Sequence, residues 1–177
     1  MNKIILTLLT ALLSMPVFAG DQPEVGAEAP AFNLQDQNGE WHKLEDYAGK
    51  WLAIYFYPKD DTPGCTKEAC NFRDNIYAFK AIEAAVVGVS VDDVESHKAF
   101  ADKYKLPFTL LADESKEMAK AYGVLKDYKL IKIASRQSFL IDPEGKIAKH
   151  YAKVDPDTHT DEVLSLIHIS EPTRQDT

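Results

Sequence analysis

The two cysteines of the chain, Cys65 and Cys70, lie five positions apart in the stretch YPKDDTPGCTKEAC. Pro63 and Gly64 precede the first thiol, and apolar residues follow at three- and four-residue spacing, so we predict that Cys65 lies in the first turn of a helix. The N–H groups of that turn lack helical partners, and the helix dipole is positive there. Such a setting favours the thiolate, which is the nucleophilic form of cysteine. The pattern therefore predicts a reactive Cys65.

The spacing also limits how Cys65 and Cys70 can interact. In a continuous helix, residues five apart are rotated by about 140° and their Cα atoms lie about 8.7 Å apart, beyond the limit of about 7 Å for a disulfide. The two thiols can therefore pair only if the first turns of the helix unwind. A structural disulfide would hold the segment permanently non-helical, and its short loop would give little entropic stabilisation. The spacing favours a redox-active pair, with a structural bridge as the alternative.

Metal binding is not expected at the two thiols. They would face different ways on a helix, and no histidine lies near them in the sequence. We expect His42, His97 and His150 at the surface rather than in a metal site.

The segments around the thiols alternate between strand and helix patterns. AFNLQDQNGEWHKL has two short apolar runs around Asn38-Gly39, which predicts a hairpin. KWLAIYFYP, AAVVGVSV and PFTLLAD are typical of buried strands. Helices are predicted from Pro63, within DDVESHKAFADKYKL after an aspartate cap, and within ESKEMAKAYGV, where Gly123 can end the helix.

A second hairpin and a last helix complete the pattern. SFLIDPEGKIAKHYAKV predicts two strands around the turn at 142–145, and a helix should begin near Asp157 or Thr158. This order describes an α/β protein with a thioredoxin-like fold, in which helices flank a central mixed sheet. The first long strand then leads directly to the helix that carries Cys65, and the site lies at the strand ends.

The stretch YFYPKDDTPGCTKEAC resembles the peroxiredoxins, whose pattern Pro-x-x-x-Thr-x-x-Cys stands here as Pro58, Thr62 and Cys65. It looks like the bacterioferritin-comigratory-protein (PrxQ) branch, in which many members place a resolving cysteine five residues after the peroxidatic one. The resemblance continues through GVSVDDVESHKAF, LPFTLLADESKEMAKAYGV and RQSFLIDPEGKI. The segment LKDYKLIKIASRQ is less like the family, which predicts a reshaped loop before Arg136.

The resemblance implies a thiol-dependent peroxidase that reduces hydrogen peroxide and organic hydroperoxides. Cys65 would attack the peroxide and become a sulfenic acid, and Cys70 would condense with it to an intramolecular disulfide. Thr62 would hydrogen-bond the peroxide, and Pro58 would shield the thiolate from bulk water. Arg136 would place a fixed positive charge beside the sulfur and polarise the O–O bond.

The resemblance further implies that Glu68 orients Arg136, that no metal or organic cofactor is needed, and that a thioredoxin-like protein is the reductant. A thioredoxin-like thiol-disulfide oxidoreductase is the alternative function, although the usual Cys-x-x-Cys is absent from the sequence. A non-catalytic binding module stapled by a structural disulfide is a third hypothesis.

The N-terminus has the layout of a secretory signal peptide: a basic MNK, an apolar run, and small residues that end at Ala19. We expect residues 1–19 to be removed, which leaves residues 20–163 as one thioredoxin-like peroxiredoxin domain. No second apolar run follows that could span a membrane. The mature protein is therefore expected to be periplasmic or secreted, without a membrane contact, where disulfides can form.

The C-terminus has a different origin in our interpretation. Leu164 to Arg174 reads LSLIHISEPTR, which resembles the translation of a transposon-end adapter used in DNA sequencing libraries. We interpret residues 164–177, including His168, as adapter sequence that follows a gene truncated near Val163. The net charge of −8 and the lack of a basic block argue against nucleic acid as a partner. A monomer is expected.

Overall fold

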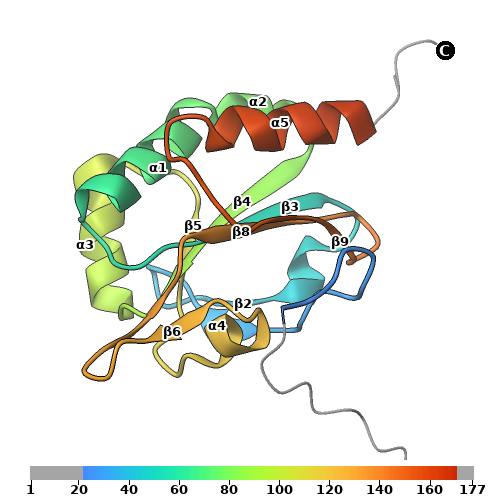
Figure 1. Cartoon of the computed structure of the whole chain (residues 1–177). Coiled ribbons are helices and arrows are strands. Elements are labelled where there is room, and N and C mark those ends of the chain that lie inside the picture. Colours follow the sequence, from blue (N-terminus) through green and yellow to red (C-terminus); the bar gives the residue numbers. More distant parts are fainter. Residues whose placement is uncertain (1–21, 171–177) are drawn as a thin grey trace, which may run out of the picture.

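The computed structural model describes residues 22–170, and a five-stranded mixed sheet lies at its centre (Figure 1). The strands follow the order β5-β4-β3-β8-β9. Their bounds are Trp51–Phe56 for β3, Ala84–Ser90 for β4, Thr109–Ala112 for β5, Gln137–Ile141 for β8 and Ile147–Tyr151 for β9. β3, β4 and β5 run parallel, whereas β8 pairs antiparallel with both β3 and β9. The predicted α/β class with a central mixed sheet is confirmed.

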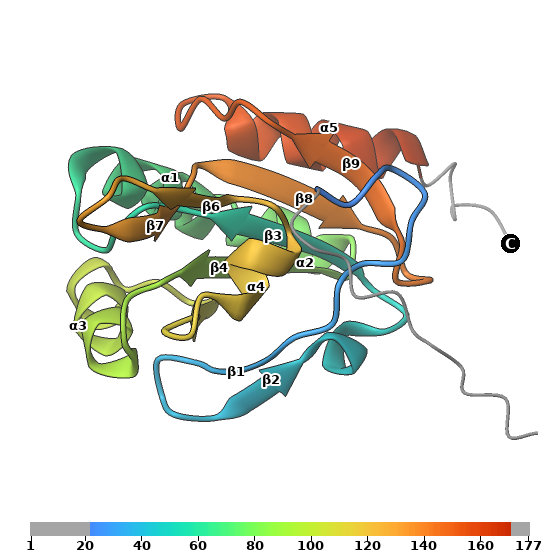
Figure 2. The ribbon, with the colours of Figure 1, turned by 60° about the horizontal axis from the view of Figure 1, so that its bottom comes forward.

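Helices cover both faces of the sheet. α1, α2 and α5 lie over one face with α3 at its edge, and α4 lies on the opposite face beside two small hairpins (Figure 1, Figure 2). The helices are α1 (Pro63–Asp74), α2 (Ile76–Ala81), α3 (Val94–Tyr104), α4 (Glu117–Ala121), α5 (His159–Ser170) and the 3-10 turn η1 (Leu44–Tyr47). The hairpins are β1 (Asn33–Gln35) with β2 (Trp41–Lys43), and β6 (Leu125–Asp127) with β7 (Lys132–Ala134).

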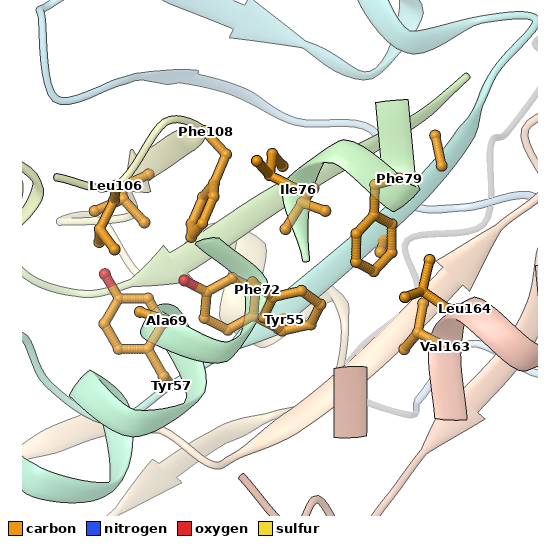
Figure 3. Packing of buried hydrophobic residues seen from close by; sticks show 14 of the residues in the cluster. Tyr55, Tyr57, Ala69, Phe72, Ile76, Phe79, Leu106, Phe108, Val163 and Leu164 are labelled. Atoms are coloured by element: carbon orange, nitrogen blue, oxygen red, sulfur yellow. The ribbon is translucent and has the colours of Figure 1, made fainter. Parts of the chain in front are cut away.

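The central strand β3 is buried along its whole length, and its side chains alternate between two apolar layers. Tyr55 and Tyr57 face α1, where Phe72 stacks on Tyr55 with ring centroids 4.8 Å apart (Figure 3). Gly88 of β4 pairs with Tyr55, and a Cβ atom there would lie 2.7 Å from the tyrosine ring. A glycine in β4 thus makes room for the aromatic layer beneath the helix that carries both thiols.

The helix that begins at Pro63 ends earlier than its apolar periodicity indicates. Asn75, with φ −101° and ψ 6°, separates α1 from α2, so Ile76 and Phe79 belong to a second helix. Both helices still bury apolar residues in the same layer, which explains why the sequence pattern continues across the break.

Other departures from the sequence pattern lie near the ends of the chain and before Arg136. The hairpin β6–β7 was not predicted, and it occupies the segment that is least like the family. α5 begins close to the expected position, and Leu164 and Ile167 are buried. The predicted signal peptide, residues 1–19, lies outside the described residues, as does everything after Ser170. Within residues 22–170, no helix is long and apolar enough to cross a membrane.

Candidate active site

The loop from β3 to α1 places Cys65 at the third position of the helix, after Pro63 and Gly64. Thr62 is the N-cap residue, but its side chain does not cap the helix, because its hydroxyl donates to the Lys59 carbonyl at 3.0 Å. The first-turn N–H groups therefore keep their positive potential beside the thiol. Cys65 itself is buried, so little water competes for this potential.

Arg136 reaches this thiol from the segment between β7 and β8. Its Nη2 atom donates to Cys65 Sγ at 3.1 Å, and its Nη1 atom pairs with Glu68 Oε2. Gly64 leaves space for the guanidinium, since a Cβ atom at that position would lie 3.2 Å from Arg136 Nη2. The structure thus brings Arg136 to Cys65 and Glu68, which lie one turn apart on α1 but about 70 positions from the arginine in the sequence. A fixed cation beside the sulfur favours a thiolate and can stabilise charge on a departing oxygen.

Glu68 is fully buried, and only one of its carboxylate oxygens is paired among the described residues. Burial raises the pKa of Glu68 to about 7, although the charge and hydrogen bond of Arg136 oppose this shift. Burial therefore has the larger effect, and the carboxyl group changes its charge close to neutral pH. The net charge that surrounds Cys65 depends on this titration.

Cys70 lies on the same helix, five residues further on. Both cysteines are free thiols, Cys65 buried and Cys70 partly exposed. α1 is continuous from Pro63 to Asp74, so helical geometry separates the two Cα atoms by about 8.7 Å. This state corresponds to the wound, reduced form of the predicted redox pair. Joining the sulfurs requires that the first turns of α1 open.

A buried polar network holds the loop between Pro58 and Thr62. Asp60 accepts hydrogen bonds from Tyr57 Oη at 2.7 Å, Ser96 Oγ at 2.7 Å and His97 Nδ1 at 2.8 Å. His97 Nε2 lies 3.0 Å from the backbone oxygen of Leu111. Because both ring nitrogens face acceptors, the imidazole needs a proton on each, and the pair is an imidazolium with a carboxylate.

The ionisation of this pair agrees with its contacts. Burial lowers the pKa of His97, but the hydrogen bond and charge of Asp60 outweigh it, and the pKa is raised. Burial likewise raises the pKa of Asp60, but His97 and two hydroxyl groups outweigh it, and the pKa is lowered. The pair thus ties the loop that carries Pro58 and Thr62 to α3.

The expected surface position of His97 was wrong: its side chain is completely buried. A signal for this was present in the sequence, because His97 shares the inward face of α3 with Phe100 and Ala101. His42 and His150 are partly exposed, and His150 stacks on Phe139.

One group of three possible metal ligands lies among residues 22–170, at the hairpin β1–β2. Asp36, Glu40 and His42 place ligand atoms within 4.8 Å of one another. Asp36 Oδ1, however, accepts the backbone N–H groups of Asn38 and Glu40, so this carboxylate stabilises the hairpin turn. We assign no metal site to this group.

The sequence profile of the AhpC/TSA family matches residues 25–150, which include both cysteines and Arg136. The chain belongs to the AhpC/TSA family. Two curated proteins that are similar in sequence to this chain are named as peroxiredoxins. The putative peroxiredoxin bcp of Coxiella burnetii is 47% identical over 148 residues, which cover 81% of this chain and 98% of that protein. Peroxiredoxin Bcp of Bacillus subtilis is 43% identical over 151 residues, which cover 81% and 94%.

Solved structures of AhpC/TSA-type peroxiredoxins have the same fold. A cysteine-to-serine mutant of PrxQ from Xylella fastidiosa is 32% identical with a TM-score of 0.80, and the alignment covers 85% of this chain and 99% of that one. A bacterioferritin comigratory protein of Xanthomonas campestris, described for its alkyl peroxide reduction activity, is 34% identical with a TM-score of 0.77 over 83% and 99%. The resemblance to the Bcp/PrxQ peroxiredoxins and the thioredoxin-like fold are confirmed.

Proposed function

We propose that this peroxiredoxin reduces hydrogen peroxide and small organic hydroperoxides, with Cys65 as the peroxidatic thiol and Cys70 as the resolving thiol. The observation that carries this proposal is the 3.1 Å contact of Arg136 Nη2 with Cys65 Sγ at the N-terminus of α1. Both the helix terminus and the guanidinium stabilise negative charge, first on the sulfur and then on the leaving oxygen.

The reaction follows from the chemistry of the two thiols. The Cys65 thiolate attacks one oxygen of ROOH, the O–O bond breaks, and RO⁻ leaves and takes up a proton to give the alcohol, or water when R is hydrogen. The sulfur becomes a sulfenic acid. Cys70 then attacks that sulfur, water leaves and the disulfide forms. A thioredoxin-like dithiol returns two electrons and two protons by exchange with the disulfide.

Two residues of the loop hold the substrate in this proposal. The Thr62 hydroxyl donates to Lys59, so its oxygen keeps lone pairs that can accept a hydrogen bond from the peroxide O–H group. Pro58 is partly buried at the start of the loop and limits the access of water to the sulfur. The Asp60–His97 pair positions both residues through the loop.

The competing functions receive less support. A thiol-disulfide oxidoreductase has no need of a cation that is placed on the attacking sulfur and held there by a buried carboxylate. A structural bridge needs a non-helical segment, whereas α1 is continuous through both free thiols.

A stopped-flow titration of the reduced protein with hydrogen peroxide tests the proposal. We expect a fast phase in which two thiols are lost per peroxide, and no such phase in Cys65→Ser. Cys70→Ser should keep one fast turnover and then accumulate sulfinic and sulfonic forms of Cys65, detected by mass spectrometry. Slow consumption with both thiols retained would contradict the peroxidase proposal, and full cycling without Cys70 would assign resolution to another thiol.

We further propose that the protein acts as a monomer outside the cytoplasm, after removal of residues 1–19, and that its reductant is a thioredoxin-like protein of that compartment. The basic and apolar N-terminal pattern supports export. N-terminal sequencing of the protein from the exporting cell checks cleavage after Ala19. Residues 164–177 remain a proposed adapter translation, and identical codons in genomic DNA would contradict it.

A further inference from the structure

The hairpin β6–β7 carries a cluster of exposed apolar side chains at its turn. Leu130 is 96% exposed, Tyr128 61% and Ile131 58%, and the three lie within four consecutive residues. The other large exposed apolar side chains of residues 22–170 lie on separate elements: Val25, Trp41, Tyr77 and Ile169. Scattered apolar residues are ordinary on a protein surface, whereas a contiguous group marks a contact site.

Hydrogen bonds from backbone N–H groups hold residues 127–131 in a tight turn. Tyr128 N–H donates to the Ile131 carbonyl at 2.9 Å, and Leu130 N–H donates to the Tyr128 carbonyl at 2.8 Å. Asp127 accepts the N–H group of Lys129 at 2.9 Å, and Lys129 adopts a φ of 67°. Asparagine and glycine are the residues preferred in that backbone conformation. The geometry of the turn therefore does not explain why lysine and leucine stand at 129 and 130. The tight turn therefore presents Leu130 outward.

The apolar turn is surrounded by lysines. Lys126, Lys129 and Lys132 are exposed, and Asp127 is the one acidic residue between them, paired with Lys132 at 3.2 Å. Three lysines and one aspartate give this segment a charge of +2, in a chain whose net charge is −8. The turn is thus a local positive site that would be oriented toward an anionic surface while the rest of the protein is repelled.

The turn lies close along the chain to Arg136, which contacts the reacting thiol. β7 ends at Ala134, and two residues later Arg136 contacts Cys65. The five residue-to-residue steps from Ile131 to Arg136 span at most about 17 Å even when fully extended. Figure 1 and Figure 2 show the turn at the periphery of the ribbon, away from the central sheet. A surface that binds the turn would therefore lie near the entrance to the site.

We propose that the turn Tyr128–Ile131, with Lys129 within it and Lys126 and Lys132 on either side, docks this protein onto an anionic lipid surface. Apolar side chains at a tip, a tyrosine at their edge and lysines with long apolar stems form the pattern of interfacial membrane contacts. A protein partner fits less well, because three side chains offer only a few hundred Å², compared with about 800 Å² for each side of a standard interface. A lipid surface needs no complementary shape.

This peripheral docking departs from the expectation that the exported protein makes no membrane contact. The lack of a second apolar run argues against a membrane span, and a docked turn needs no span. The inference rests on the proposed peroxidase function for its consequence: hydroperoxides that form on lipid chains would be presented to Cys65 at the membrane surface. The same balanced reaction then yields the lipid alcohol, water and the Cys65–Cys70 disulfide.

Co-sedimentation of the reduced protein with vesicles tests the docking directly. Vesicles of equal parts phosphatidylglycerol and phosphatidylcholine should bind the protein, and phosphatidylcholine alone should bind it far less. Lys126→Gln and Lys129→Gln should each weaken binding about fivefold. Raised salt should also weaken binding, because it screens the attraction between the lysines and the anionic lipid. Leu130→Ser with Ile131→Ser should weaken it tenfold or more. Trp41→Ser removes an apolar side chain on the other hairpin that is about as exposed as Ile131. It is the matched control and should bind as the wild type does.

Turnover separates this inference from the function on which it rests. The Leu130→Ser/Ile131→Ser protein should reduce dissolved hydrogen peroxide at the wild-type rate but phospholipid hydroperoxide in anionic vesicles at least tenfold more slowly. Equal vesicle binding by this variant and the wild type would overturn the docking proposal, and so would a defect seen only in KM for a thioredoxin-like reductant, which would assign the turn to a protein partner. Failure of the wild type on dissolved peroxide would instead contradict the peroxidase function, while vesicle binding would still report on the turn.

Discussion

The buried pair of Asp60 and His97 offers a prediction that can be worked out from its contacts. Asp60 accepts three side-chain hydrogen bonds, and His97 connects it to the Leu111 carbonyl. We compare two substitutions, His97→Phe and Asp60→Asn. Phenylalanine removes the cation and leaves a buried carboxylate and a buried carbonyl without their partner. Asparagine removes the charge of residue 60, keeps one oxygen that accepts, and replaces the other with an NH₂ group that donates.

The two substitutions should differ in cost. Removing one partner of a buried ion pair costs about 3–5 kcal/mol, so His97→Phe should lower the free energy of unfolding by that amount. Asp60→Asn should cost about 1–3 kcal/mol, because a neutral His97 can still donate to Leu111 and accept from the new amide. Both should also slow the reaction of Cys65 with peroxide, by up to about a hundredfold, since the loop that carries Thr62 loses its anchor.

The contribution of the pair to the free energy of unfolding depends on pH in a direction that the two pKa shifts determine. The raised pKa of His97 gives stability that is complete below the unfolded value of 6.5 and is lost as the pH rises through the folded value. The lowered pKa of Asp60 gives stability that is present above 3.8 and is lost as the pH falls through its folded value. The pair therefore contributes most between these limits. Above pH 6.5 the wild type should lose up to about 1.4 kcal/mol per pH unit relative to Asp60→Asn, until His97 is deprotonated.

Urea unfolding followed by fluorescence and circular dichroism, at a series of pH values from 5 to 9, measures this difference. The difference in the free energy of unfolding between wild type and Asp60→Asn cancels the contribution of other titrating groups, such as Glu68, because both proteins contain them. A constant difference between wild type and Asp60→Asn across this range would refute the charged pair, and so would a cost of His97→Phe no larger than that of Asp60→Asn.

Three further predictions concern the residues around the thiol. Because burial raises the pKa of Glu68 to about 7, Glu68→Gln should remove an inflection near pH 7 from the rate at which Cys65 reacts with peroxide in stopped flow; an unchanged inflection would assign it to another group. Gly64→Ala should slow the same step about tenfold or more without lowering the melting temperature, because its Cβ atom meets the Arg136 guanidinium whereas alanine favours a helix; an unchanged rate would mean that the arginine moves aside freely. Amide exchange across 66–73 should be faster in the oxidised than in the reduced protein, because α1 must open to join the sulfurs, and equal protection would contradict local unwinding.

Much of the fold and the centre of the site could be predicted from the sequence because their signals are local. The apolar runs of the central strands and the turn at 142–145 depend on neighbouring residues, and so does the helix start at Pro63. The motif of Pro58, Thr62 and Cys65 lies within one loop and one helical turn, so its spacing is visible without a fold. The five-residue interval to Cys70 follows from helix geometry alone.

The hairpin β6–β7 shows where local signals fail. Its strands are only three residues long, which is too short for a clear pattern. Its turn has a positive φ at Lys129, where the usual glycine or asparagine would have predicted a turn. The break at Asn75 was missed for a related reason, because α1 and α2 bury their apolar faces in one layer and the periodicity continues across the gap.

The sequence by itself determined the chemistry of this protein: a nucleophilic thiol at a helix start, a second thiol that an intact helix keeps apart, and the alternation of strands and helices. Only the tertiary structure decided the electrostatics. Arg136 meets Cys65 across 71 positions, and His97 meets Asp60 across 37, through pairings of strands and helices that no local pattern records. Burial depends on the whole fold, and it turns Glu68 into a group that titrates near neutral pH. The contact with Asp60, also set by the fold, outweighs burial and makes His97 half of an ion pair.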